Sequence, residues 1–181
     1  MSVLQVFTFP HPVLTQEAKA VARFDSELKQ LADNMLETMY AEGGIGLSAN
    51  KVGQLKRLIV VDLRNEDPDE LARPRPERRR EPRIFVNPSL LDASGETVTE
   101  EACLSVVDFT AEVKRAQRIV VGYQTLAGEA REETLEDLAA VCLQHEMDHL
   151  AGKLFIDHLP PLKRQIVKRR LAKIAKLAKS A

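Results

Sequence analysis

Residues 144–150, read from Gln144 to Leu150 as QHEMDHL, decide both the fold class and the chemistry. Histidines four positions apart lie on one face of a helix, so His145 and His149 can bind the same metal ion. Glu146 stands beside them, where a carboxylate can take up and release a proton. The alternative is a helix with two core histidines and a surface glutamate, but burying such polar groups without a metal is costly. The stretch therefore predicts a metal site carried by a helix.

Two histidines leave a tetrahedral site one protein ligand short. Downstream of His149 there is no glutamate, and Asp157 and His158 follow the expected helix end too closely to reach back. We interpret His158 as a structural or surface histidine. Upstream, Cys103 offers a thiolate, a strong ligand for a soft or borderline metal, although a lone cysteine also suits a small core position. Cys142, on roughly the same side of the helix as the histidines, is expected to line a pocket or the core.

Apolar residues at helical spacing predict two helices. One covers Thr134–Leu150 and carries the metal site, and Gly152 is suited to stop it. The other covers Phe24–Tyr40, and either Asp25 or Ser26 can cap its start.

Strands are indicated by short apolar runs rich in β-branched residues. They are expected at Leu58–Leu63, Ile84–Val86 and Arg118–Gln124, with turns at Gly95 and Ala127-Gly128. Short antiparallel strands with segregated helices define an α+β protein.

Bulk properties narrow the class further. A length of 181 residues suits one domain over 1–181, and 44% hydrophobic residues suffice for a packed core. The formal net charge of -1 favours no polyanionic partner, so no DNA partner is expected. Residues 1–10 lack the features of a signal peptide, and no run approaches a membrane span. Two cysteines without an export signal favour reduced thiols and a cytoplasmic location, away from membranes.

The segment from Asn65 to Arg83 differs in composition from the rest. It is rich in proline and in mixed charge, with the run Arg78-Arg79-Arg80 among acidic residues. It has almost nothing to bury, so we predict a mobile surface loop. A nucleic-acid patch is the weaker alternative, because mixed charge weakens any net field.

The segment 160–181 predicts a basic C-terminal helix. Val167, Leu171, Ile174 and Ala178 fall on one face, and the remaining positions are rich in Lys and Arg without any acidic residue. One interpretation is a helix that docks on the rest of the protein, with a solvated face whose cations interact favourably with the C-terminal end of the helix dipole. The same cations equally suit a surface that binds an anionic partner such as RNA or a membrane, and both interpretations stay open.

Three segments, in order and with matching spacing, resemble the motifs of the peptide deformylase family. Residues 44–51 (GIGLSANK) resemble G-x-G-L-A-A-x-Q, residues 101–105 (EACLS) resemble E-G-C-L-S, and residues 144–152 resemble Q-H-E-x-D-H-L-x-G. The similarity extends over nearly the whole chain, and only the segment from Asn65 to Arg83 looks inserted.

The resemblance implies a specific fold and activity. The fold is α+β, with a central H-E-x-x-H helix surrounded by antiparallel β-sheets and followed by a C-terminal helix. The activity is removal of the N-formyl group from the formylmethionine of newly made polypeptides. The natural metal is Fe²⁺, for which Zn²⁺, Ni²⁺ or Co²⁺ can substitute. The C-terminal helix of some members docks on the ribosome, which implies the same contact for the basic helix here.

Site residues follow from the same resemblance. It implies that Cys103, His145 and His149 are metal ligands and that Glu146 is the catalytic carboxylate acting on the attacking water. Lys51 and the backbone N–H of Leu104 would face the formyl oxygen. The residues that would line or closely approach the substrate are Gly44, Ile45, Gly46, Leu138, Val141 and Cys142.

The chain departs from the family motifs at three positions. Lys51 replaces a glutamine, Ala102 replaces a glycine and Val107 stands where proline is common. Lys51 puts a flexible cation in place of a neutral donor, and beside a divalent metal its pKa is expected to fall. Ala102 would strain the backbone if φ were positive there.

The departures motivate alternatives. One is a hydrolase of another formylated or acylated amine, and another is a non-catalytic, metal-stabilised ribosome-binding protein. A general endoprotease with this motif is disfavoured, because the downstream third ligand of such enzymes is missing.

Overall fold

The computed structural model describes residues 2–74, 77 and 79–178. Its helices are α1 (Ser26–Ala41), α2 (Pro68–Leu71), α3 (Asp137–Leu150) and α4 (Pro161–Ala178), with 3-10 turns η1 (Pro12–Thr15), η2 (Ala49–Val52), η3 (Leu63–Glu66) and η5 (Phe155–His158). Its strands are β1 (Gly46–Ser48), β2 (Leu58–Val61), β3 (Arg83–Ser94), β4 (Thr97–Cys103), β5 (Val106–Arg115), β6 (Arg118–Gln124) and β7 (Ala130–Glu136). The predicted α+β class is confirmed.

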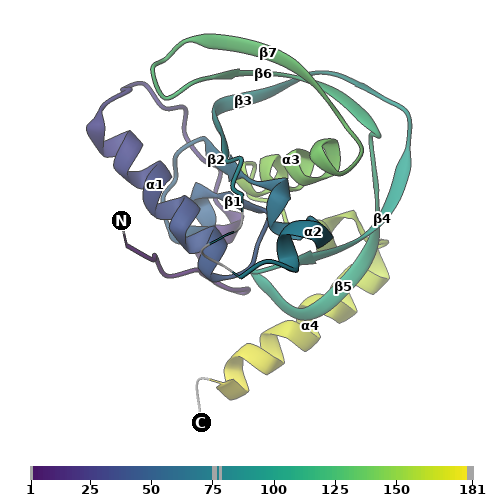
Figure 1. Cartoon of the computed structure of the whole chain (residues 1–181). Helices are drawn as coiled ribbons and strands as arrows, with labels where there is room; N and C mark the ends of the chain where they lie inside the picture. The colour runs from purple at the N-terminus through teal and green to yellow at the C-terminus, as the bar shows by residue number, and fades with distance from the viewer. Residues whose placement is uncertain (1, 75–76, 78, 179–181) are drawn as a thin grey trace.

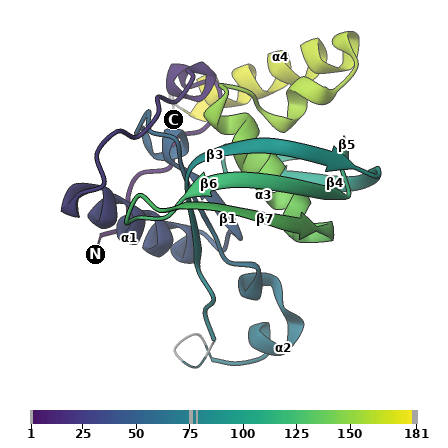
Figure 2. The same ribbon diagram turned by 90° about the horizontal axis from the view of Figure 1, so that it is seen from above.

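The strands form two antiparallel sheets around α3. The larger sheet has the order β1-β2-β3-β6-β7, and β4 and β5 form a separate two-stranded sheet. Figure 1 shows α3 in the middle of the molecule, and in Figure 2 the strands β3, β6 and β7 run side by side across it. The helix with the metal motif is therefore central, as expected.

Strand β2 lies between two helices, which explains its uninterrupted apolar sequence. Leu58 and Val60 belong to the core cluster built on α1, whereas Ile59 and Val61 belong to the cluster built on α3. Successive side chains of a strand point to opposite faces, so both faces of β2 are buried. This packing fixes β1 and β2 relative to the metal helix.

The start of α1 is capped as predicted by one of the two candidates. The Asp25 side chain accepts a hydrogen bond from the backbone N–H of Leu28 at 3.0 Å, and the helix begins at Ser26. Phe24 therefore lies outside the helix, because the capping residue takes an extended conformation.

The predicted start of the metal helix at Thr134 is wrong. Residues 130–136 form β7, which pairs with β6 so that Leu135 lies opposite Ile119 and packs into the core. Pairing across the sheet overrides the helical spacing of these residues. The predicted stop is confirmed: Gly152 has φ +70°, and a Cβ there would lie 2.7 Å from the Thr15 carbonyl oxygen.

A strand was predicted at Ile84–Val86, but the strand there, β3, is much longer. The β4–β5 hairpin was not predicted. Strand β3 runs to Ser94, and its second half is exposed on the surface. It stays extended because β6 provides its hydrogen-bond partners up to the pair Ser94–Arg118. The turns expected at Gly95 and Ala127-Gly128 are confirmed between consecutive strands.

The segment from Asn65 to Arg83 contains more structure than predicted. It holds α2, and the buried carboxylate of Glu70 accepts a hydrogen bond from the backbone N–H of Arg79 at 2.7 Å. Arg80 lies over the Tyr40 ring at 4.0 Å. The expectation that this segment buries almost nothing is therefore wrong around α2, and Arg78 lies outside the described residues. The predicted mobility of the segment from Asn65 to Arg83 stays a prediction.

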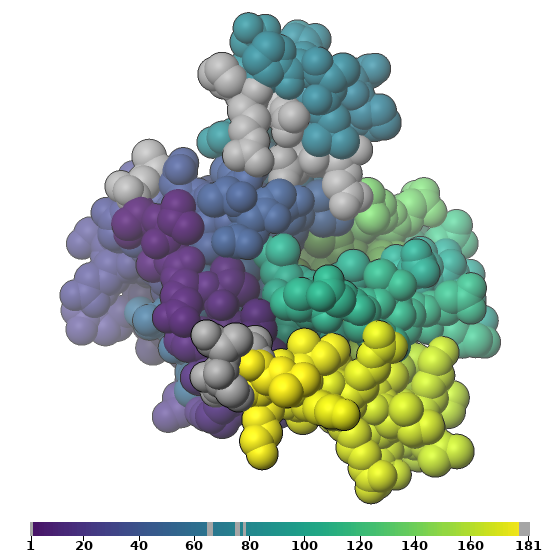
Figure 3. Space-filling model, turned by 90° about the horizontal axis from the view of Figure 1, so that it is seen from below, coloured from purple at the N-terminus to yellow at the C-terminus, as the bar shows by residue number. Residues whose placement is uncertain are grey.

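Helix α4 docks through one part of its length. Val167 and Leu171 are buried, and Lys168 forms an ion pair of 2.6 Å with Asp157 of η5. Ile174 falls on the same helical face as predicted but is 44% exposed, because the helix continues past the elements it packs on (Figure 1). Figure 3 shows α4, in yellow, lying along one side of the molecule. The side chain of Ala178 is not described. In the described part of the chain, no helix has the length and apolarity to cross a membrane.

Candidate metal centre

Three potential metal ligands converge from α3 and the end of β4. The Nε2 atoms of His145 and His149 are 3.1 Å apart, and the Cys103 Sγ lies 3.2 Å from His149 Nε2. All three ligand atoms lie within 4.8 Å of one another. The structure thus brings together the three residues that the sequence analysis selected as ligands.

Cys103 is held by the turn that joins β4 to β5. It is the last residue of β4 and pairs with Val106, the first of β5. The backbone N–H of Ser105 donates to the Cys103 sulfur at 3.4 Å. The tight connection therefore aims the sulfur at α3.

A carboxylate behind the site orients His145. Glu101 Oε2 lies 2.7 Å from His145 Nδ1, and both carboxylate oxygens bind Arg115, at 2.7 Å to Nε and 3.0 Å to the terminal nitrogen. A hydrogen bond at Nδ1 turns the other ring nitrogen towards a metal. Burial raises the pKa of Glu101, but His145 and Arg115 outweigh it and lower the pKa to about 2.

The contacts continue to the surface behind α3. Arg115 also binds Asp148 Oδ2 at 2.5 Å, and the same oxygen lies 2.7 Å from His158 Nε2. We call Glu101, Arg115, Asp148 and His158 the rear network. Within it His158 has the structural role predicted for it, outside the ligand cluster.

The electrostatics of the ligand cluster favour a cation. Burial raises the pKa of the Cys103 thiol, but Lys51 and His145 lower it more, so the thiolate is favoured. Burial lowers the pKa of His145, yet Cys103, Glu101 and Glu146 raise it to about 9. Burial and nearby cations hold the pKa of His149 well below its usual value, so its imidazole is neutral. A neutral imidazole and a thiolate are the forms in which these side chains bind a divalent metal ion.

Two residues of the ligand cluster, Cys103 and His145, line a cavity of about 760 Å³. One wall is formed by Gly44, Ile45 and Gly46, and α3 contributes Leu138, Val141 and Cys142. Lys51, Leu104 and Glu146 also line the cavity. His149 is fully buried. The residues chosen from the sequence are therefore neighbours in space, and their individual roles remain predictions.

Lys51 points into the site. It lies in η2, is 1% exposed, and its Nζ forms a 2.8 Å ion pair with Glu146 Oε1. Burial lowers the pKa of Lys51, but the carboxylate of Glu146 and the thiol of Cys103 raise it above the ordinary value. The protein groups thus oppose the lowered pKa expected for this lysine, because two acidic neighbours surround it.

The other two departures have mild consequences. The described non-glycine residues with positive φ are Asn87, Asp108 and Asp137, so Ala102 adopts a backbone conformation without that strain. Val107 is 53% exposed and lines the cavity beside the ligand turn.

The residues that support the candidate ligands were not predicted from the sequence. Glu101 and Asp148 were inside quoted motifs without a role, and Asn50, whose side-chain amide donates to the His149 carbonyl, lay in the first motif. The role of Arg115 could not be predicted from its neighbours in the sequence, because its partners are distant in sequence. The cavity wall from β5 was also missed, although alternation through Phe109, Ala111 and Val113 could have indicated that strand.

A cysteine and two histidines around a buried carboxylate, beside a cavity, define a metallohydrolase centre. A family model described as Polypeptide deformylase matches residues 3–165. The chain belongs to the polypeptide deformylase family, whose members are metal-dependent hydrolases.

Individual relatives agree over almost their full lengths. The chain is 46% identical to the peptide deformylase of Phenylobacterium zucineum, over 98% of this chain and 100% of that protein. It is 45% identical to peptide deformylase 1 of Shewanella oneidensis, over 97% and 98%. The crystal structure of a Legionella pneumophila peptide deformylase superposes with a TM-score of 0.84 at 36% identity, covering 99% of both chains.

Proposed function

We propose that this chain hydrolyses the N-formyl group from N-formylmethionine at the start of newly made polypeptides, in the cytoplasm. In this proposal Cys103, His145 and His149 hold Fe²⁺, and Glu146 acts as the general acid and base. The observation that carries it is the position of Glu146, which lies beside the three ligands and lines the cavity, with Oε2 buried. Within the described part of the chain, Oε2 has no hydrogen-bond partner.

The chemistry follows from the groups that surround the formyl carbon. A divalent metal bound by this ligand set supplies a Lewis acid and activates a water for attack. Glu146 takes a proton from the attacking water and later delivers it to the amine nitrogen as the C–N bond breaks. The products are formate and a free N-terminal amine. In this proposal Lys51 and the backbone N–H of Leu104, both of which belong to residues that line the cavity, donate to the developing oxyanion.

The cavity suits an N-terminal methionine. Apolar side chains of Ile45, Leu138, Val141 and Cys142 offer a pocket for its thioether side chain. Gly44 is in close contact with Leu104, since a Cβ there would lie 3.2 Å from Leu104 Cδ1. The close approach of these residues narrows the space next to the ligands, which favours formyl, the smallest acyl group.

Fe²⁺ is the proposed metal, and Zn²⁺, Ni²⁺ or Co²⁺ are expected to replace it. One thiolate and two imidazoles suit each of these ions, so the ligand set selects a class of metals. The rear network supports His145 whichever of them is bound.

The test is formate release from formyl-Met-Ala-Ser by protein loaded anaerobically with Fe²⁺ and, in parallel, with Ni²⁺. We expect release with both metals. The matched control is His149→Ala, which removes one ligand and should lose both bound metal and activity. Absence of formate release by the fully metal-loaded wild type would overturn the proposed function. Release from an acetylated peptide in its place would favour a hydrolase of other acylated amines.

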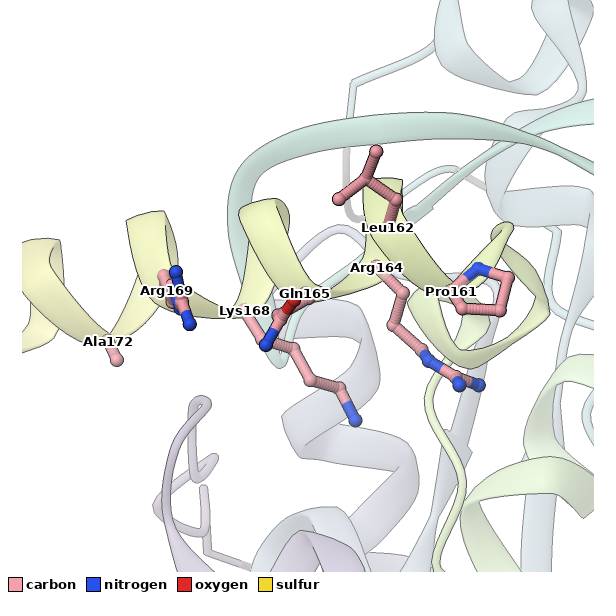
Figure 4. A pocket seen from close by; sticks show the side chains of 7 residues that line it. All are labelled: Pro161, Leu162, Arg164, Gln165, Lys168, Arg169 and Ala172. Atoms are coloured by element: carbon pink, nitrogen blue, oxygen red, sulfur yellow. The ribbon is translucent and has the colours of Figure 1, made fainter.

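We also propose that α4 contacts the ribosome. Its cations include Arg164, Lys168, Arg169, Arg170 and Lys173, with no acidic residue in the helix. Figure 4 shows Arg164 and Lys168 extending from the same side of α4 beside a groove lined by this helix. These two contact Asp157 of η5, whereas Arg169, Arg170 and Lys173 are exposed to an anionic partner.

The ribosome contact can be tested without disturbing the docked face of α4. Replacing Arg169, Arg170 and Lys173 by glutamine keeps the buried Val167 and Leu171. We expect weaker co-sedimentation with ribosomes, with the difference largest at low salt. Unchanged co-sedimentation would leave α4 with a structural role alone.

A further inference from the structure

Lys51 stands where the family motif has glutamine, and its contacts suggest a role that glutamine does not have. Its Nζ lies 2.8 Å from Glu146 Oε1 and 3.4 Å from the Gly46 carbonyl oxygen. The two side chains are only 2% and 4% exposed. We propose that Lys51 is a positioning residue that fixes Glu146 by Oε1 and leaves Oε2 as the oxygen that exchanges the proton. This inference rests on the proposed function.

The carboxylate of Glu146 is held from a second side by Gly46. A Cβ at Gly46 would lie 3.0 Å from both Glu146 Cγ and Oε1, and 2.9 Å from Cys142 Sγ. The side chain of Glu146 thus passes directly over a backbone position that has no room for a side chain. Because both Gly46 and Lys51 lie against Oε1, the direction of the carboxylate is determined by packing as well as by charge.

The number of donors separates lysine from glutamine at this position. An ammonium has three N–H donors, whereas a glutamine amide has two donors and one acceptor oxygen. Glu146 Oε1 and the Gly46 carbonyl engage two donors of Lys51, and the third is available to the cavity that Lys51 lines. One lysine can therefore hold the proton-transfer group and donate to the formyl oxygen together. A glutamine that served the formyl oxygen would hold Glu146 with fewer donors and without charge.

The first test separates positioning from binding through kinetics. Lys51→Ala, Lys51→Gln and the exposed-lysine control Lys29→Gln are compared in Ni²⁺-loaded protein for formate release. We expect Lys51→Ala to lower kcat about 10²-fold, with KM changed only a few-fold. Lys51→Gln should show a smaller loss in the same direction, and Lys29→Gln none. Higher kcat in Lys51→Gln than in wild type would overturn the proposal, as would a kcat of Lys51→Ala within about threefold of wild type.

Chemical rescue identifies the missing group. Ethylammonium fits the space left by the lysine side chain in Lys51→Ala and carries three N–H donors. We expect it to restore kcat with saturation. Tetramethylammonium has the same charge but no N–H donor, and it should restore nothing. Equal effects of the two cations would show a nonspecific response to charge and contradict a positioning role.

The second test needs no turnover, so it stays valid if the proposed activity fails. Melting temperatures of Ni²⁺-loaded wild type, Lys51→Met, Glu146→Gln and the double variant form a double-mutant cycle. Each single variant leaves a buried group without its charged partner and should lower Tm by about 10 °C. The fall in Tm of the double variant should be clearly smaller than the sum of the falls in the two single variants. Additive losses would show that Lys51 and Glu146 are not coupled, and the proposal would fall.

Discussion

Two sets of charged side chains surround the candidate metal ligands, and they differ in how completely they are partnered. In the rear network, both oxygens of Glu101 bind Arg115, and Oε2 also meets His145. The pair Lys51–Glu146 is incomplete, since within the described residues Glu146 Oε2 has no hydrogen-bond partner.

The difference separates rigidity from reactivity. A fully paired buried network holds its members in one geometry, and removing one member leaves the others uncompensated. A buried oxygen without a partner is costly, and it persists where substrate or water provides the partner. We therefore expect variants of Lys51 and Glu146 to change turnover as well as stability, and variants of the rear network to change stability and metal affinity with a smaller effect on turnover at saturating metal.

The largest effect is expected for Glu146→Ala. Loss of the general acid and base should lower kcat by about 10²–10⁴-fold, because water must then lose and deliver its protons unaided. Metal content, measured by elemental analysis, should stay at the wild-type level, since the three ligands remain. Retained activity would show that another group moves the proton.

The rear network is best broken at Arg115. Arg115→Met leaves the buried carboxylate of Glu101 and the partly buried carboxylate of Asp148 without their shared cation, so the free energy of unfolding should fall by about 3–5 kcal/mol. Urea denaturation of both proteins measures it. The exposed Arg131→Met is the matched control and should change stability by less than about 0.5 kcal/mol. A small loss in Arg115→Met would mean that the rear network is not needed for stability.

Glu101→Gln tests whether the rear network supports metal binding. The amide oxygen still accepts from His145 Nδ1, but the negative charge that strengthens this imidazole as a ligand is lost. Metal affinity, measured by competition with a chelating dye, should fall about 10–100-fold. At saturating metal, kcat should change far less than in Glu146→Ala. Unchanged metal affinity would show that the charge of Glu101 does not strengthen His145 as a ligand.

The smallest effect is expected at the outer end of the rear network. The side chain of His158 is 37% exposed and meets only the rim of the network at Asp148. His158→Gln should therefore lower the free energy of unfolding by no more than about 1 kcal/mol. A loss as large as that of Arg115→Met would show that the network acts as a single unit up to the surface.

Much of the fold and site could be predicted, and the misses have physical causes. The helical spacing of 144–150 placed two ligands on one face, and the first capping candidate, Asp25, is the one used in α1. The start of α3 was placed too early because Leu135 suits a helix and a strand equally, and only its partner Ile119 selects the strand. The hairpin of β4 and β5 was missed because its register depends on pairing between residues far apart.

By itself the sequence determined the α+β class, the family and the three candidate ligands that the structure brings together, because these depend on residue identity in short motifs. The expectation of a single domain over 1–181 stays a prediction. Tertiary structure decided what could not be predicted locally: that Lys51 turns inward to Glu146, that Arg115 joins Glu101 to Asp148, and that Ile174 is exposed. Charge pairing and burial depend on distances between elements, and those distances exist only once the chain has folded.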